Sequence, residues 1–210
     1  MSAPSEFLHV FEPGTERTPG WTFLMLHGTG GDENDLRDLG RYLAPDVAQL
    51  RPRGQVLERG MPRFFRRLAE GVFDLEDLIA RTHALADFVL RAAEQYAFDT
   101  RRVMAVGYSN GANIAVSTLL LRSGVLAGAV LFHPMVPLVP EQPPDLHHVP
   151  IFIGAGTADP IVPAAQTEAL AQMLAGYGAR VTVHWQSGGH SLGQSEVEQA
   201  RIWLAPLLAT

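Results

Sequence analysis

The stretch VMAVGYSNGANIAV, residues 103–116, holds a serine between two glycines where one apolar pattern gives way to another. Val103 to Val106 form a short apolar run with two β-branched residues, which is typical of a buried strand. From Ala112 onward, apolar residues recur at helical spacing. Ser109 is therefore predicted at a sharp corner between a strand and a helix. Glycines two residues before and after it remove Cβ atoms that would collide as the corner closes.

The order of predicted elements gives this corner its context. Strands are predicted at 22–26, 47–50, 103–106, 127–132, 151–153 and 181–185, with a possible edge strand at 7–11. Helices are predicted at 32–43, 75–96, 110–121, 163–177 and 195–208. Alternating strands and helices imply a mostly parallel sheet with helices on both faces. We expect one α/β domain over residues 1–210, without a large cap domain.

Three side chains with complementary chemistry follow predicted strands. Ser109, Asp159 and His190 come after the strands that end near residues 106, 153 and 185. Because ligands bind at the carboxyl ends of parallel strands, we expect the three to meet there. Their chain order, Ser then Asp then His, is that of an α/β-hydrolase. Ser109 is predicted as the nucleophile, His190 as its base and Asp159 as the acid that orients His190.

Each prediction has an ordinary alternative. Ser109 could be a simple N-cap at a strand–helix turn, and Asp159 a turn residue before proline. Asp145 is a rival acid, but it lies among prolines at the opposite edge of the sheet. Of the eight histidines, only His27, His133 and His190 directly follow predicted strands, and only His190 comes after the acid.

A glycine-rich loop, His27-Gly28-Thr29-Gly30, follows the first central strand. Its position predicts that the backbone N–H groups of Thr29 and Asn110 stabilise an oxyanion in the transition state. His27 is expected to order this loop and not to act as a second base. The alternative is a plain glycine-rich turn that leads into the next helix.

Composition excludes several kinds of chemistry. The chain has no cysteine, and all 16 of its basic residues are arginine, so cysteine nucleophiles, Schiff-base lysines and the P-loop lysine are excluded. A net charge of −6 with scattered acidic residues argues against a nucleic-acid surface. Neither a signal-like start nor a segment long enough to span a bilayer is recognisable, so a cytoplasmic location is expected.

Two further motifs resemble cofactor sites. Gly154-x-Gly156 has Asp159 where a dinucleotide fingerprint has its third glycine. The pair His147-His148 lacks the spacing of a metal site. No cofactor and no metal are predicted.

Four motifs together resemble one known family. They are LHGTGGDEND at 26–35, GYSNGA at 107–112, GTADPIVP at 156–163 and GGHSL at 188–192. They are similar to the phospholipase/carboxylesterase family of α/β-hydrolases, which includes acyl-protein thioesterases, and residues 53–78 look closer to its bacterial carboxylesterases, including hydroquinone-linked ones. The thioesterases usually have Gln after the nucleophile, where this chain has Asn110.

The resemblance implies a serine carboxylesterase that acts on small esters, needs no cofactor and could form a homodimer. An acyl thioesterase or lysophospholipase is the alternative within enzymes. A hydrolase fold that only binds its ligand is the alternative outside them.

The connection between the strand at 47–50 and the helix at 75–96 is far longer than the usual 4 to 6 residues or so. Long connections at a ligand-binding edge often form lids or binding loops. We expect Met61, Phe64 and Phe65, together with Met135, to wall a small apolar pocket that favours short-chain or aryl esters. The alternative is that these aromatic side chains pack on the sheet.

Overall fold

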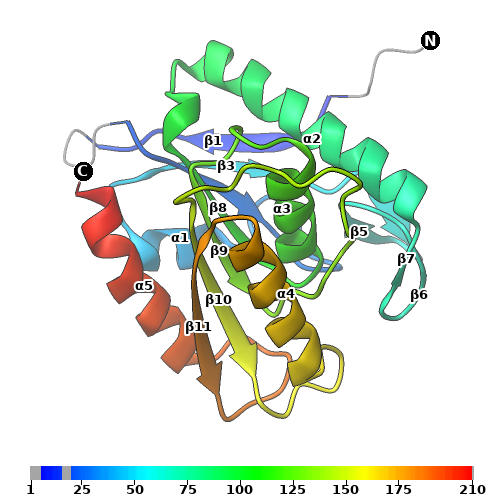
Figure 1. Ribbon diagram of the computed structural model, residues 1–210. Helices are drawn as coiled ribbons and strands as arrows, with labels where there is room; N and C mark the ends of the chain where they lie inside the picture. Colours follow the sequence, from blue (N-terminus) through cyan, green and yellow to red (C-terminus); the bar gives the residue numbers. More distant parts are fainter. Residues whose placement is uncertain (1–5, 16–19, 210) are drawn as a thin grey trace.

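The computed structural model describes residues 6–15 and 20–209 (Figure 1). A seven-stranded sheet forms its centre, in the order β1-β3-β2-β8-β9-β10-β11. All neighbouring strands pair in parallel except β1, which is antiparallel to β3 at the edge. The strands are β1 (His9–Glu12), β2 (Thr22–Leu26), β3 (Ala48–Pro52), β8 (Val103–Tyr108), β9 (Gly128–Phe132), β10 (Pro150–Gly156) and β11 (Arg180–Gln186).

Helices cover both faces of the sheet, as predicted (Figure 1). They are α1 (Arg37–Leu43), α2 (Leu75–Tyr96), α3 (Asn110–Leu121), α4 (Ala164–Gly176) and α5 (Gln194–Leu208), with a short 3-10 turn at Thr100–Arg102. Side chains of one strand alternate between two buried clusters. In β2, Leu24 and Leu26 belong to the cluster with α2, α3 and α4, while Phe23 and Met25 belong to the cluster with α1 and α5.

The largest differences from the predicted elements lie in two segments. The helix predicted at 32–43 begins only at Arg37, because Asp32 organises turns before it: its side chain accepts from the Asn34 N–H at 2.7 Å. The long connection after β3 is not one loop. It forms two short hairpins, β4 (Val56–Glu58) with β5 (Met61–Arg63), and β6 (Arg67–Ala69) with β7 (Val72–Phe73).

Hydrophobic periodicity in the sequence could not reveal the two hairpins, because their strands span only two or three residues. Their turns contain Gly60 at φ +83° and Gly71 at φ +72°, a region where glycine carries no steric penalty. None of the helices in the described ranges is both long and apolar enough to cross a bilayer.

Candidate active site

Of the three residues predicted to act together, His190 lies within hydrogen-bond distance of both Ser109 and Asp159. Ser109 ends the turn between β8 and α3, Asp159 follows β10, and His190 follows β11. The His190 Nε2 atom lies 2.8 Å from Ser109 Oγ, and His190 Nδ1 lies 2.7 Å from Asp159 Oδ2. The carboxyl ends of three parallel strands thus bring together residues that are up to 81 positions apart in sequence.

Ser109 occupies a strained backbone conformation, with φ 52° and ψ −112°. Such a conformation costs about 1 to 3 kcal/mol for a residue with a side chain, and it persists where the surroundings enforce it. A Cβ on Gly107 would lie 2.7 Å from the Ala112 nitrogen, and a Cβ on Gly111 would collide with the Leu26 carbonyl. Both glycines of the motif are therefore required for the helix to approach β2 and β8.

Asp159 is held as an acceptor on all sides. Its Oδ1 accepts from the N–H groups of Ile161 at 2.8 Å and Val162 at 2.9 Å, while Oδ2 faces His190. Burial acts to raise the pKa of Asp159, but the hydrogen bonds from Val162, His190 and Ile161 outweigh it and hold the pKa below its usual range. The rival Asp145 is exposed and accepts from the His147 N–H at 2.9 Å.

The loop after β2 lies beside Ser109, and Thr29 and Asn110 line the same pocket as Ser109. Arg63 Nη1 donates to Thr29 Oγ1 at 2.6 Å and fixes this residue. His27 is buried and orders the loop: one ring nitrogen lies 2.7 Å from the Gly28 carbonyl, and the other accepts from the Gly54 N–H at 2.9 Å. Burial lowers the pKa of His27, which keeps the ring neutral.

The pocket at Ser109 has a volume of about 200 Å³. Its other lining residues are Thr29, Arg63, Arg67, Glu70, Gly71, Phe73, Tyr108, Asn110, Asn113, His133, Met135, Ile161, Val162 and His190. Met135 is among them, as expected, and its N–H donates to Asn113 Oδ1 at 2.9 Å. The pocket is small compared with the roughly 300 to 1,000 Å³ of typical ligand sites, so it suits a small substrate.

The expectation for the aromatic residues needs correction. Phe64 and Phe65 are 1% and 0% exposed and belong to the core cluster under α2, outside the pocket wall. They connect two hairpins, and burying two rings there fastens the whole segment to the sheet. The Phe64 N–H also donates to Asn110 Oδ1 at 2.8 Å. Met61 is 40% exposed and lies against Gly30, beside the pocket rather than in its wall.

Several site residues were not predicted from the sequence. Arg63 and Arg67 line the pocket, although a basic cluster in sequence usually indicates a solvated surface. His133 lies 2.9 Å from Asp159 Oδ2, the oxygen that also faces His190. Its position directly after a central strand was the available signal, since such residues reach the same edge of the sheet.

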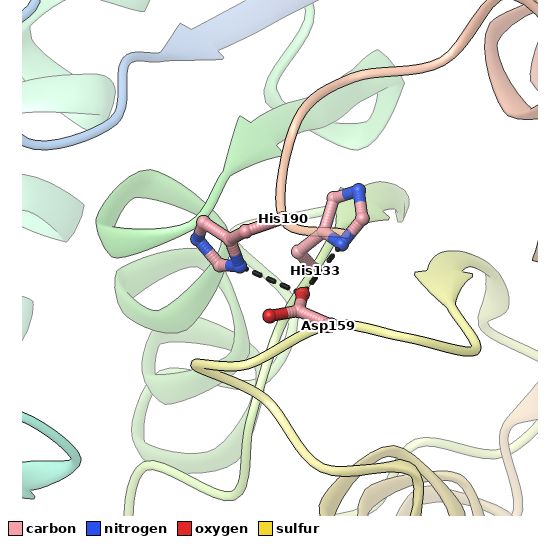
Figure 2. A group of neighbouring side chains, drawn as sticks. All are labelled: His133, Asp159 and His190. Carbon is pink, nitrogen blue, oxygen red and sulfur yellow. Dashed lines mark hydrogen bonds and ion pairs between the residues drawn. The ribbon is translucent and has the colours of Figure 1, made fainter. Parts of the chain in front are cut away.

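A metal ion would need converging ligand atoms, and one such group exists among the described residues. Atoms of His133, Asp159 and His190 lie within 4.8 Å of one another (Figure 2). In both histidines, however, the Nδ1 atom points to the same oxygen, Asp159 Oδ2, at 2.9 and 2.7 Å. Both rings thus contact one carboxylate oxygen, and these contacts fix the orientation of the two rings.

Known proteins share this architecture. The model of the dienelactone hydrolase family matches residues 60–200. The chain is 53% identical to the putative hydrolase MhqD of Bacillus subtilis, over 93% of this chain and 96% of that one. Among solved structures, a Bacillus cereus carboxylesterase is 48% identical with a TM-score of 0.90, covering 95% and 94% of the two chains. YahD, solved with malic acid, is 33% identical with a TM-score of 0.89, covering 95% and 98%.

These matches confirm the resemblance to carboxylesterases that the sequence motifs indicated, and they confirm the α/β-hydrolase fold. The family model includes the segments that carry Ser109, Asp159 and His190. The first central strand and its glycine-rich loop lie outside the matched range, but the full-length relatives cover them. The chain therefore belongs to the dienelactone hydrolase family.

Proposed function

We propose that this protein is a serine carboxylesterase that hydrolyses small carboxylic esters through an acyl-Ser109 intermediate. The observation that carries the proposal is the continuous hydrogen-bonded chain from Ser109 through His190 to Asp159, at 2.8 and 2.7 Å, with Ser109 and His190 lining a pocket. A serine hydroxyl is too weakly acidic to attack an ester unaided, and this arrangement supplies the base that it needs.

In the proposed reaction, His190 Nε2 takes the proton of Ser109 while Oγ attacks the ester carbonyl. The N–H groups of Thr29 and Asn110 stabilise the resulting oxyanion, and such donors are typically worth about 3 kcal/mol each in the transition state. Asn110 is the first residue of α3, so the positive end of the helix dipole favours this negative charge. His190 then protonates the leaving alcohol, and water hydrolyses the acyl-enzyme by the reverse sequence of proton transfers.

The pocket wall favours an ester that also carries a negative charge. Arg63 and Arg67 both line the pocket, and a single carboxylate, Glu58, pairs with both, at 3.4 and 2.9 Å. Two guanidinium groups against one carboxylate leave positive charge beside the nucleophile. Glu70 also lines the pocket, but it lies at an exposed hairpin turn, where water screens its charge. The relative YahD was solved with malic acid, a dicarboxylic acid, which agrees with an anionic substrate.

This charge preference can be measured with one substitution. Arg67→Gln is expected to lower kcat/KM for the monomethyl ester of a short dicarboxylic acid about tenfold, because a charge-assisted contact is lost. Hydrolysis of the neutral methyl ester of matching length should change little. Arg66→Gln is the matched control, since Arg66 is exposed and pairs with Asp74 outside the pocket. Equal losses for both esters would contradict an anionic substrate.

A fluorophosphonate probe tests the proposed nucleophile. It is expected to label Ser109 in the folded wild-type protein, and peptide mass spectrometry locates the site. Ser187 and Ser191 are exposed and close to the site, so they serve as internal controls for non-specific reaction. Labelling of either in place of Ser109 would overturn the assignment. Failure to label folded protein would favour a hydrolase fold that only binds.

A panel of oxygen esters and thioesters of graded acyl length separates the enzyme alternatives. The pocket of about 200 Å³ favours short acyl groups over the long chains of lysophospholipids. We expect kcat/KM to fall as the acyl chain lengthens, and faster turnover of oxygen esters than of matched thioesters. The cytoplasmic location and the homodimer expected from the sequence stay predictions, which cell fractionation and light scattering can test.

A further inference from the structure

A second histidine, His133, contacts the same oxygen of the proposed catalytic acid as His190 does (Figure 2). His133 Nδ1 lies 2.9 Å from Asp159 Oδ2, and His133 Nε2 lies 3.0 Å from Glu196 Oε1. The hydrogen-bonded chain that begins at Ser109 therefore continues through Asp159 and His133 to Glu196 on α5. Both ring nitrogens of His133 face a carboxylate oxygen.

The extension is completely buried. The side chains of His133 and Glu196 are 0% exposed, and that of Asp159 is 1% exposed. Fold features accommodate it: a Cβ on Gly154 would collide with Glu196, and His133 has a positive φ of 55°. Few non-glycine residues adopt this backbone conformation, and histidine is among those that tolerate it.

Counting donors and acceptors determines where the protons lie. Glu196 Oε1 also accepts from Gln186 Nε2 and from the Gly193 N–H, both at 2.8 Å, so it carries no proton. The other oxygen, Oε2, has no hydrogen-bond partner among the described residues, so a proton there would bond to nothing. Glu196 is thus an acceptor at Oε1, as Asp159 is at Oδ2. His133 can donate to both only as the doubly protonated imidazolium.

The charges around the His133 ring also favour a doubly protonated imidazolium. Burial acts to lower the pKa of His133, yet the hydrogen bonds and charges of Glu196 and Asp159 outweigh it and raise the pKa above its usual value. The other titratable groups facing the ring are His190, with ring centroids 5.1 Å apart, and Tyr108 at 6.1 Å. Burial raises the pKa of Tyr108, so it stays a neutral phenol.

We propose that His133, held as a cation between Asp159 and Glu196, is a positioning residue that orients Asp159 and keeps His190 unprotonated to lower pH. The His133 cation and His190 both donate to Asp159 Oδ2. The positive charge of His133 therefore weakens the electrostatic attraction between Asp159 and a second proton on His190. Repulsion between the two neighbouring rings acts in the same direction. The inference rests on the proposed esterase function, since its effect is read through the base role of His190.

The sign of the effect follows from the charges. Ester hydrolysis falls on the acid side when His190 becomes protonated, because a protonated ring cannot accept the Ser109 proton. Removing the cation at residue 133 makes protonation of His190 more favourable, so activity should be lost at higher pH. Removing Glu196 as well deletes a more distant negative charge and offsets part of that change.

The inference is tested by pH profiles of kcat/KM for a neutral ester, measured for the wild-type protein and three variants. His133→Asn keeps an N–H for Asp159 and tolerates the positive φ, but it removes the charge. We expect the midpoint of the acid limb to rise by about one pH unit in His133→Asn, and by about half a unit in the double variant with Glu196→Gln. His148→Asn is the matched control, an exposed histidine with φ 63°, and should leave the limb in place.

A purely structural role of His133 predicts another pattern. In His133→Asn, kcat/KM would then fall at every pH, while the midpoint of the acid limb would equal that of the His148→Asn control. That result would overturn the inference even if the enzyme is an esterase. The second measurement needs no activity. In nitrogen-15 spectra of the wild-type protein at pH 7, both ring nitrogens of His133 should be protonated, with the signals assigned by their loss in His133→Asn. A neutral ring would overturn the inference independently of the proposed function.

Discussion

Ser109→Ala is expected to remove hydrolysis of an activated aryl ester almost completely, lowering kcat on the order of a millionfold. The reason is that Oγ is the atom proposed to form the bond to the acyl group, and it is the atom that faces His190 Nε2 at 2.8 Å. The pocket and the N–H groups of Thr29 and Asn110 would remain, so a small residual rate above the uncatalysed reaction should persist.

The Ser109→Ala variant should fold, because alanine removes one oxygen and leaves both flanking glycines in place. Thermal unfolding and near-ultraviolet circular dichroism verify this. Ser117→Ala is the matched control: Ser117 is fully buried on α3, and its hydroxyl donates only within the helix, to the Asn113 carbonyl at 3.0 Å. Near-normal turnover by Ser109→Ala, with activity lost in Ser117→Ala, would refute the assignment of the nucleophile.

Asp159→Asn is expected to lower kcat roughly ten-thousandfold, because an amide facing His190 favours the ring tautomer that cannot take the Ser109 proton. The contacts of Asp159 add a second consequence. An amide N–H in place of Oδ2 would face a protonated nitrogen of His133 as well as His190. We therefore expect a lower melting temperature alongside the loss of rate, since two donors would face each other in a buried site.

Asp145→Asn provides the comparison for Asp159→Asn. The Asp145 side chain is exposed and accepts only from the His147 N–H, at 2.9 Å, among the hydrogen bonds of the described residues. An asparagine oxygen can accept this hydrogen bond equally well, so both rate and melting temperature should stay near the wild-type values. If Asp145→Asn lost activity and Asp159→Asn retained it, the assignment of the acid would be wrong.

Much of the fold could be predicted from local patterns in the sequence. Helices α2 and α3 begin and end at the predicted residues, and the strand at 22–26 matches β2. Helical periodicity and short apolar runs depend on neighbouring residues, so these patterns are visible without the tertiary structure. The grouping of Ser109, Asp159 and His190 followed from one further rule, that parallel strands end at a common edge.

Tertiary contacts decided which side chains line the pocket, which fill the core and which surround Asp159. Whether Phe64 and Phe65 line a pocket or fill the core depends on where the two hairpins pack, and no periodicity within strands of two or three residues reveals that. The partnership of His133 with Glu196 joins residues 63 positions apart on different elements. Such a contact arises only when α5 packs against β10 and β11. The sequence alone therefore determined the order of Ser109, Asp159 and His190 along the chain, while the packing determined the charges around them.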